Sequence, residues 1–198
     1  KINTTKILNA IGSDTRIGEK YLGLGPMYSG PCFPRDNLAM LAFYKYLKIS
    51  GDLFSSTDRI NNLQTDRIIK IINGNNKFKN KRLGFLGLTY KSGTDLFTDS
   101  PAFYIVNKIG SKRKNKITGY DPYFKEKVQK EISKKYKISI HNSLDAFIKN
   151  TDIIFLSYKD NKFSKVTKYK NKIFIDPWNF FKKNSSNSKI ICPGICQK

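Results

Sequence analysis

A cysteine, an arginine and an aspartate lie close together in the glycine- and proline-rich residues 25–36, as Cys32, Arg35 and Asp36. The apolar periodicity that follows predicts a helix, so amide dipoles and the Arg35 guanidinium favour thiolate over thiol at Cys32. Asp36 can accept bonds from first-turn amides of that helix, or it can orient or deprotonate a water. The set suits covalent catalysis at a carbonyl carbon. A buried structural cysteine in a glycine-rich turn is the alternative.

A second candidate is the segment LGLTYKSGTD at residues 86–95, between a predicted strand and a predicted helix. Glycine there lets the backbone approach a phosphate, and Lys91 supplies a positive charge near the carboxyl end of the strand. The segment is not GxGxxG, so a strand-to-helix turn with an incidental lysine is the alternative.

Asp121 and the C-terminal cysteines are weaker candidates. Asp121 ends the second predicted strand, where dinucleotide-binding sheets often carry a ribose-binding acid, but a turn-forming Asp-Pro explains it equally well. Cys192 and Cys196 have no second cysteine pair, and His141 is the only histidine of the chain. We therefore expect no metal site and no chemical role for these two cysteines.

Residues 1–77 predict helices separated by breakers. Helices are expected at 3–11, from Asp36 to about residue 47, and at 56–72, with a glycine-rich stretch at 18–30. The Asn-Gly-Asn-Asn sequence at 73–76 and the lysines after it mark a boundary.

Beyond that boundary, short apolar strands alternate with helices. Strands are expected at 82–88, 116–120, 138–141, 152–158, 172–175 and 189–192, and helices at 101–109, 123–134 and 144–149. This order implies a parallel sheet covered on both faces. The sequence thus predicts an α/β fold class: a helical segment, residues 1–77, followed by a Rossmann-like parallel-sheet domain, residues 78–198. Ligands of such sheets bind beyond the carboxyl ends of the strands.

Composition narrows the function classes. The 198 residues contain 37 Lys and Arg against 15 Asp and Glu, for a formal charge of +22. The densest basic runs, at 77–82, 112–116 and 125–137, fall in expected loops or on solvent-facing helix positions, which argues against a nucleic-acid interface. A positive field also concentrates anionic small molecules. No apolar run approaches the ~18 residues of a membrane span. Three cysteines and no leader-like start favour a reducing, cytoplasmic setting.

Four stretches occur in one order along the chain. Arg16-Ile-Gly18 is followed by YSGPCFPRD at 28–36, NNLQ at 61–64, LGLTYKSGTD with Asp99-Ser100-Pro101, and YDP at 120–122. They resemble the motifs RIG…G(Y/F)GGxCfpKD, N-x-x-Q, LGLaFKxxTDDxRESP and YDP of the UDP-glucose/GDP-mannose dehydrogenase family. The resemblance covers essentially the whole chain.

The resemblance implies a chemistry for the cysteine loop. Family members oxidise the C6 alcohol of a nucleotide sugar to a carboxylate in two steps, of the UDP-glucose to UDP-glucuronate type, with two NAD+ and a covalent thioester. Cys32 would be the nucleophile, and Asp36 matches the carboxylate associated with the water step. Arg35 stands where the family usually has lysine, so a cation is kept, although arginine cannot lose its proton.

The resemblance also implies a binding site and a partner. The substrate would be a UDP- or GDP-linked sugar, and Arg16 would reach the substrate of the neighbouring subunit, which implies a homodimer made by the helical segment. Tyr90 and Lys91 would contact the diphosphate end of the nucleotide. The substrate-binding residues are then Arg16, Tyr21, Tyr28, Gly30, Arg35, Tyr90 and Lys91.

Some positions depart from the family pattern. Ser29 and Pro31 replace small glycine-like residues beside the thiol, and Thr98 replaces an arginine of the signature. Trp178, in the sequence DPWN at 176–179, stands where many members have DgRN. Trp178 can stack on a base or sugar, or it can be an ordinary core or rim tryptophan.

The family's NAD-binding domain, with its GxGxxG, has no counterpart in these 198 residues. We expect the chain to be a C-terminal part of a longer polypeptide, assign none of its residues to NAD, and expect this part alone to be inactive as a dehydrogenase. A nucleotide-sugar-binding module without dehydrogenase activity is the first alternative. A polyanion- or nucleic-acid-binding protein is the second.

Overall fold

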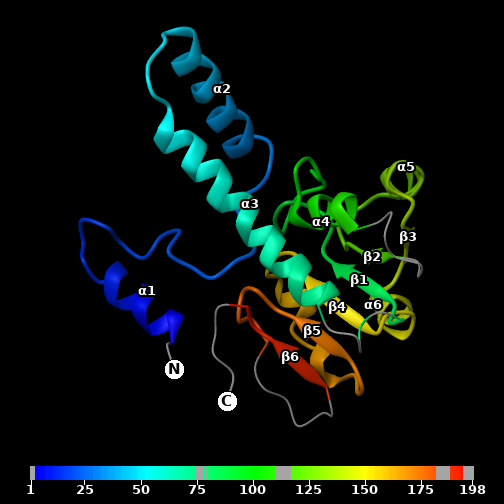
Figure 1. Ribbon diagram of the computed structural model, residues 1–198. Helices are drawn as coiled ribbons and strands as arrows, with labels where there is room; N and C mark the ends of the chain where they lie inside the picture. The colour runs from blue at the N-terminus through cyan, green and yellow to red at the C-terminus, as the bar shows by residue number, and fades with distance from the viewer. Residues whose placement is uncertain (1–2, 75–77, 79, 110–116, 182–187, 194–198) are drawn as a thin grey trace.

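The computed structural model describes residues 3–74, 78, 80–109, 117–181 and 188–193 (Figure 1). Its α-helices are α1 (Thr4–Gly12), α2 (Phe33–Tyr46), α3 (Asp52–Asn73), α4 (Pro101–Ile109), α5 (Glu126–Tyr136) and α6 (Leu144–Lys149). Its strands are β1 (Leu83–Leu86), β2 (Thr118–Tyr120), β3 (Ser139–Ile140), β4 (Ile153–Leu156), β5 (Ile173–Ile175) and β6 (Lys189–Ile191). Two 3-10 helices, η3 (Asn161–Phe163) and η4 (Val166–Lys168), connect β4 to β5. The predicted α/β class, with helices first and a parallel sheet second, is confirmed.

The strands form a six-stranded sheet in the order β3-β2-β1-β4-β5-β6, and each pair is parallel. Every residue of β1 and β4 is buried, as expected of central strands covered on both faces. The strand order reverses between β1 and β4, so the carboxyl ends of these two strands bound the crevice where such sheets bind ligands.

Alternate side chains of the central strands enter two separate apolar cores. Leu83, Phe85 and Phe155 pack in the core that holds residues of α3, α4 and α5. Leu86 and Leu156 face the opposite core, which holds residues of α6 and the 3-10 helices. The period-two pattern of each strand therefore builds a three-layered domain.

Local capping sets two of the helix starts. The Asn3 side chain accepts a hydrogen bond from the Lys6 amide at 3.2 Å at the start of α1. Ser143 Oγ accepts one from the Ala146 amide at 3.2 Å at the start of α6. Both bonds satisfy first-turn amides that lack partners within the helix.

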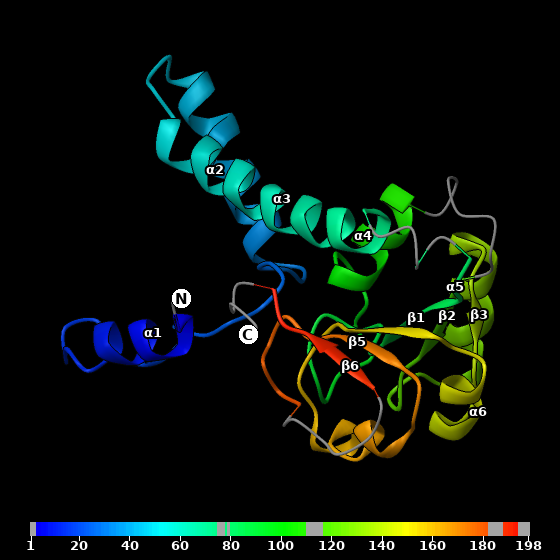
Figure 2. The same cartoon turned by 60° about the horizontal axis from the view of Figure 1, so that its bottom comes forward.

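Helix α3 joins the two predicted units. Its first half pairs with α2 in a hairpin, and its second half runs along the sheet domain beside α4 (Figure 2). Ile68 and Ile72 of α3 are 2% and 1% exposed and belong to the sheet core. The helix begins at Asp52 rather than at the predicted residue 56, because its first turns lean on α2, where Asn37 Nδ2 donates to the Phe54 carbonyl at 3.0 Å.

The regions outside the sheet domain are exposed. Helix α2 contains no buried residue. Helix α1 and the start of the loop after it stand apart from the hairpin and the sheet (Figures 1 and 2), whereas the end of that loop lies against the sheet domain at Gly25 and Gly30. Among the described residues, no helix combines the length and the apolar character that crossing a membrane would require.

Candidate active site

Cys32 lies just before a helix, as predicted, but α2 begins at Phe33 rather than at the predicted Asp36, so Cys32 is the N-cap residue and Asp36 lies inside the first turns without a side-chain capping bond. The Cys32 side chain is exposed. The Asp36 amide donates to the Cys32 carbonyl at 2.8 Å, and a proline lies in the first turn of the helix. Arg35 Nε donates to Asp36 Oδ1 at 2.8 Å in an exposed ion pair. The hydrogen bond to Asp36 raises the pKa of Arg35, and the charges of Asp36 and Cys32 add to the effect. Thiol, cation and carboxylate are thus gathered at one helix N-terminus.

The loop that leads to Cys32 crosses the carboxyl edge of the sheet. Gly25 lies against the Trp178 ring, so close that a Cβ at Gly25 would stand 2.9 Å from the indole. Further along, Gly30 lies against the Tyr90 ring. Trp178 follows β5 and Tyr90 follows β1, so the loop spans both strand ends. This placement brings the thiol segment to the edge where parallel sheets bind their ligands.

Gly30 meets a requirement that other residues do not. Its φ is +89°, a left-handed conformation, and a Cβ would stand 2.5 Å from Tyr90 Cδ2. The Gly30 amide donates to the Asp99 carbonyl at 3.3 Å. Because the residue has no side chain, the backbone of the cysteine loop can lie flat on the tyrosine ring.

Tyr28 is held on the other side of the loop by α3. Its amide donates to Asn61 Oδ1 at 2.8 Å, and its carbonyl accepts from Asn61 Nδ2 at 3.0 Å. The Tyr28 hydroxyl is buried and has no partner among the described residues. Burial raises the pKa of this hydroxyl, and the charge of Asp58 raises it further. Tyr28 therefore presents a neutral phenol.

Tyr90 and Lys91 follow β1 as predicted and lie side by side. The Tyr90 amide donates to the Leu96 carbonyl at 3.1 Å, and Thr89 Oγ1 donates to the Lys91 carbonyl at 2.8 Å. Lys91 is exposed, with Nζ 5.3 Å from the centre of the Tyr90 ring. The Tyr90 ring, which contacts Gly30, thus has the Lys91 ammonium beside it at the carboxyl end of β1.

A polar cluster behind Lys91 was not predicted from the sequence. Asp160 accepts hydrogen bonds from Ser92 Oγ at 2.7 Å, Tyr123 OH at 2.6 Å and the Lys162 amide at 2.8 Å. Burial raises the pKa of Asp160, but these three hydrogen bonds outweigh burial and lower it overall. The signal available in the sequence was only that Asp160 comes shortly after the buried strand β4.

The Asp121 carboxylate accepts hydrogen bonds from donors of the protein itself. Its Oδ2 accepts from the Leu88 amide at 2.7 Å, the Thr89 amide at 3.0 Å and the Tyr158 hydroxyl at 3.0 Å. Its Oδ1 accepts from the Tyr123 amide at 2.9 Å. The turn interpretation is therefore favoured over the ribose-binding one, because the carboxylate is occupied by protein donors.

The turns that follow β1 and β2 do not fit a dinucleotide. The Asp121 carboxylate that would hold a ribose is filled by the β1 loop itself. The side of Gly87 that would approach a pyrophosphate is covered by Tyr158, whose Cε1 would lie 2.5 Å from a Cβ there. These residues therefore form a closed turn rather than a cofactor site.

Trp178 forms part of the rim at the carboxyl end of the sheet. Its indole Nε1 donates to the Ser157 carbonyl at 3.2 Å, and its amide donates to Asp176 Oδ1 at 3.1 Å. Lys159 Nζ lies 5.6 Å from the ring centre. The side chain is half-buried between the sheet and the Gly25 backbone, which fits the rim interpretation.

Arg16 and Tyr21 are not brought to the other candidates. Tyr21 is 98% exposed with a φ of 65°. Arg16 forms an exposed ion pair with Asp14 at 2.6 Å. Both lie in the segment that stands apart from the sheet (Figure 1), so their predicted roles at a substrate remain predictions.

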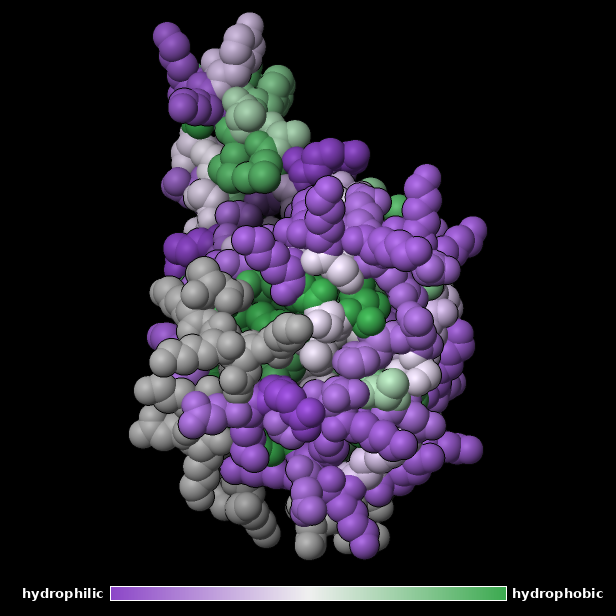
Figure 3. Space-filling view, turned by 90° about the vertical axis from the view of Figure 1, so that its right-hand side faces the viewer, coloured by the Kyte–Doolittle hydropathy of each residue, from purple (hydrophilic) through white to green (hydrophobic). Residues whose placement is uncertain are grey.

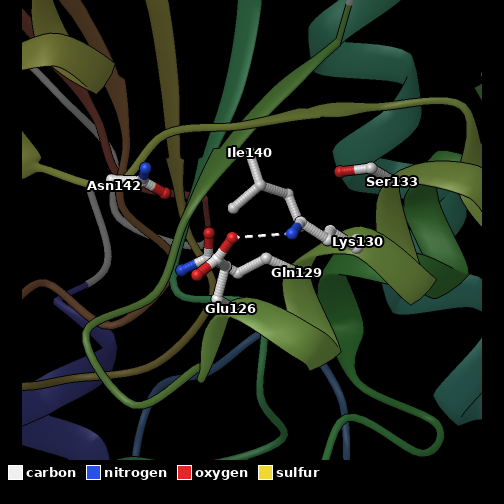
Figure 4. Close-up of a pocket in the computed structure, with 6 residues that line it drawn as sticks. All are labelled: Glu126, Gln129, Lys130, Ser133, Ile140 and Asn142. Carbon is white, nitrogen blue, oxygen red and sulfur yellow. Dashed lines mark ion pairs between the residues drawn. The ribbon is translucent and has the colours of Figure 1, made fainter.

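Two other surface features lie away from Cys32. The lysines of α5 and its flanks are exposed as predicted, and the side of the molecule that carries α5 and β3 is dominated by hydrophilic side chains (Figure 3). A pocket of about 350 Å³ on that side is crossed by the Glu126–Lys130 ion pair of 2.7 Å (Figure 4). It contains none of the predicted site residues: its lining is Glu126, Gln129, Lys130, Ser133, Ile140 and Asn142.

Of the two C-terminal cysteines, the structure describes only Cys192, which lies away from Cys32. The Cys192 thiol lies 3.6 Å from Asn179 Oδ1, and Cys196 is outside the described residues. Within the described ranges, no group of three or more His, Cys, Asp or Glu side chains is arranged to hold a metal ion.

Comparison with known proteins matches both units. Residues 84–183 match the UDP binding domain of the UDP-glucose/GDP-mannose dehydrogenase family, and residues 1–63 match its central domain. The UDP-glucose 6-dehydrogenase of Rickettsia conorii is 31% identical over 168 residues, which is 83% of this chain and 38% of that protein. The chain therefore spans well under half of this relative.

Solved structures show the same fold. A UDP-glucose dehydrogenase from Pyrobaculum islandicum superimposes with a TM-score of 0.81 at 21% identity, covering 96% of this chain and 43% of that one. A GDP-mannose dehydrogenase from Pseudomonas aeruginosa gives a TM-score of 0.74 at 20% identity, covering 94% and 45%.

Proposed function

The chain belongs to the UDP-glucose/GDP-mannose dehydrogenase family, and from this premise we propose that it supplies the thiol and the nucleotide-sugar site of an NAD-dependent nucleotide-sugar 6-dehydrogenase. One observation carries the proposal. The Cys32 loop is laid on the sheet through Gly30, which contacts Tyr90 directly beside Lys91. A nucleotide bound at Tyr90 and Lys91 can therefore present its sugar to the cysteine loop.

The anionic part of the substrate would bind at the carboxyl end of β1. The exposed Lys91 ammonium faces the diphosphate, and the adjacent Tyr90 ring offers a flat apolar surface. Tyr28, with its neutral hydroxyl, lines the sugar and nucleotide pocket, while Tyr21 stays a predicted contact because it lies in the segment that stands apart from the sheet. The net charge of +22 attracts such a dianion to the chain.

The chemistry assigned to Cys32 is addition to an aldehyde-level C6 carbon. The thiolate attacks that carbon from an exposed position at the N-terminus of α2. After oxidation to the thioester, water attacks the carbonyl carbon, and Asp36 orients this water while Arg35 holds the carboxylate in place. The product is a sugar carboxylate and the free thiol.

We assign the binding of NAD, the hydride acceptor, to residues outside this chain. In such enzymes bound NAD accepts the hydride, but the turns that follow β1 and β2 in this chain do not fit a dinucleotide. We therefore expect the 198 residues alone to bind the nucleotide sugar without oxidising it.

A homodimer is the proposed assembly. Helix α2 and the start of α3 expose Phe33, Phe43 and Leu53 at 66%, 52% and 74%. Exposed apolar side chains gathered on one hairpin are typical of an interaction surface. In the dimer, Arg16 of one subunit would contact the substrate of the other.

The first test is binding of UDP-glucose, a UDP-N-acetylhexosamine and GDP-mannose, measured by calorimetry at about 0.15 M salt. We expect one of them to bind, and Lys91→Ala to weaken its binding roughly tenfold or more, because a charge-assisted phosphate contact is lost. Lys127→Ala is the matched control, since it removes the same charge from an exposed position on α5. Equal losses in the two variants would contradict a specific site at Lys91.

The same samples separate the alternatives. Binding of any polyanion with an affinity that falls steeply with salt would favour the polyanion-binding alternative. Nucleotide-sugar binding with a Cys32 that iodoacetamide does not alkylate would favour a binding module without dehydrogenase chemistry.

A further inference from the structure

The side chain of Asn61 satisfies both backbone groups of Tyr28, a residue 33 positions earlier in the chain. The Tyr28 amide donates to Oδ1 at 2.8 Å, and Nδ2 donates to the Tyr28 carbonyl at 3.0 Å. Asn61 is only 8% exposed. Two hydrogen bonds to one residue fix both the position and the tilt of its peptide groups, as a neighbouring strand would.

Asn61 is itself fixed to the sheet domain by its helix. It shares one face of α3 with Thr65, Ile68 and Ile72, at helical spacing. Ile68 and Ile72 are buried in the sheet core, and Thr65 Oγ1 lies 3.0 Å from Met27 Sδ in the same loop. The face changes from apolar to polar where it leaves the sheet and meets the loop backbone.

The loop between Tyr28 and Cys32 has only one further described hydrogen bond to the sheet domain, from the Gly30 amide to the Asp99 carbonyl at 3.3 Å. Asn61 therefore anchors the upstream end of the thiol segment from α3, while Gly30 rests on Tyr90. The described contacts of Asn61 do not include Tyr90 or Lys91.

We propose that Asn61 is a positioning residue that sets the place of the Cys32 thiol relative to the nucleotide-sugar site, acting through the backbone of Tyr28. This role rests on the function proposed above. Removing the Asn61 amide releases the loop that carries the thiol and leaves the nucleotide contacts after β1 intact. Binding and thiol placement are then separable by mutation.

The first experiment measures the two hydrogen bonds between the Asn61 side chain and the Tyr28 backbone. Amide hydrogen exchange at Tyr28 is followed by NMR in the 198-residue chain, in Asn61→Ala and in Asn62→Ala. Asn62 is the matched control, because it is adjacent on α3 but its side chain bonds to Tyr104 and Asp58. We expect Tyr28 exchange to accelerate about tenfold or more in Asn61→Ala, since its acceptor is lost, and to change little in Asn62→Ala.

A conservative variant protects the test against simple unfolding. Asn61→Asp keeps an acceptor for the Tyr28 amide, but it replaces the donor to the carbonyl with a second carboxylate oxygen, which repels the Tyr28 carbonyl oxygen. We expect intermediate exchange at Tyr28 in Asn61→Asp. If Tyr28 exchanges at the same rate in all variants, Asn61 does not hold the Tyr28 backbone and the proposed positioning role is wrong.

The second experiment measures thiol placement. In a Cys192→Ser, Cys196→Ser parent, Cys32 is the only thiol of the chain. Its alkylation by iodoacetamide is timed with and without a saturating concentration of whichever of the three nucleotide sugars, UDP-glucose first, binds the parent. We expect the sugar to slow alkylation several-fold in the parent and in Asn62→Ala. In Asn61→Ala we expect this protection to be lost, although the Kd for UDP stays within about threefold of the parent.

The outcomes distinguish the two proposals. A parent that binds UDP-glucose, together with an Asn61→Ala variant that keeps full protection of Cys32, overturns the positioning role alone. A parent that binds none of UDP-glucose, the UDP-N-acetylhexosamine and GDP-mannose overturns the proposed function, and the positioning role with it. If Asn61→Ala does not fold, Asn61→Asp carries the same comparison.

Discussion

The sheet domain buries its apolar side chains, whereas the α2–α3 hairpin exposes many of its own. Every residue of β1 and β4 is buried, whereas α2 contains no buried residue. Phenylalanines occur in both regions: Phe155 is 0% exposed in β4, and Phe43 is 52% exposed in α2. The described residues thus complete a core around the sheet and leave the hairpin uncovered.

This difference separates folding from assembly. Buried apolar area is the main favourable term in stability, so the sheet domain supplies most of the stability of this chain. In the proposed homodimer, the apolar side chains that the hairpin exposes would contact the partner subunit. The cysteine loop lies between the two regions and contacts both, through Tyr90 of the sheet domain and Asn61 of α3.

The largest expected change in stability comes from replacing a phenylalanine in the sheet domain, and the same replacement in the hairpin is its control. Phe155→Ala should lower the free energy of unfolding by about 3–5 kcal/mol, because it leaves a cavity beside Phe85, whose ring centre is 5.6 Å away. Phe43→Ala should change it by less than about 0.5 kcal/mol. Urea unfolding of dilute chain measures both values. A Phe43→Ala loss as large as that of Phe155→Ala would mean that the hairpin is folded against a core of its own.

A smaller effect is expected from the loop that bridges the regions. Gly30→Ala should cost about 2 kcal/mol, because it adds a clash with Tyr90 to an unfavourable left-handed backbone. Gly18→Ala is the matched control, with a φ of +75° and no neighbour within 4 Å, and should cost about 1 kcal/mol. The same unfolding curves give both numbers. Equal costs would show that contact with Tyr90 does not tie the loop to the sheet domain.

The smallest effect concerns His141, the only histidine of the chain. Burial lowers the pKa of His141 below its ordinary value, and its Nε2 is buried with no partner among the described residues. As pH falls from 7.5 through about 6.5, the unfolded chain therefore takes up the proton first. Stability that is fully present above this pH is lost below it, until the folded-state pKa is reached.

We expect that loss to be about 1 kcal/mol or less between pH 7.5 and pH 5.5. Urea unfolding at several pH values measures it, and His141→Gln should remove this component of the pH dependence. The opposite result would be a free energy of unfolding that rises as pH falls through this range in the unmodified chain but not in the variant. It would mean that folding raises the pKa of His141 rather than lowering it.

The sheet could be predicted because each strand carries its own signal. The runs LGFL and IIFL are uniformly apolar, and the structure places them at β1 and β4 in the centre of the sheet. The predicted strands at 82–88 and 152–158 were longer than the observed ones, because the residues at their carboxyl ends turn into loops that hold the site. The 3-10 turns between β4 and β5 have no periodic pattern to reveal them.

The candidate site could be predicted only in part. The position of Cys32 at a helix start and that of Lys91 after a strand are local features, and both follow from the sequence. Asn61 bonds to a residue 33 positions away, and Asp160 bonds to Ser92, which is 68 positions away. Such pairs depend on how the elements pack, so neither propensity nor spacing along the chain identifies them.

Helix α3 has a mechanical consequence. Its 22 residues extend about 33 Å, with one end embedded in the sheet core and the other in the uncovered hairpin. A tilt of about 5° at the embedded end carries the free end through about 3 Å and the middle of the helix, where Asn61 grips the thiol loop, through about half that distance. A displacement of the hairpin that tilts α3 would therefore move the Cys32 loop at Asn61 by about half as much.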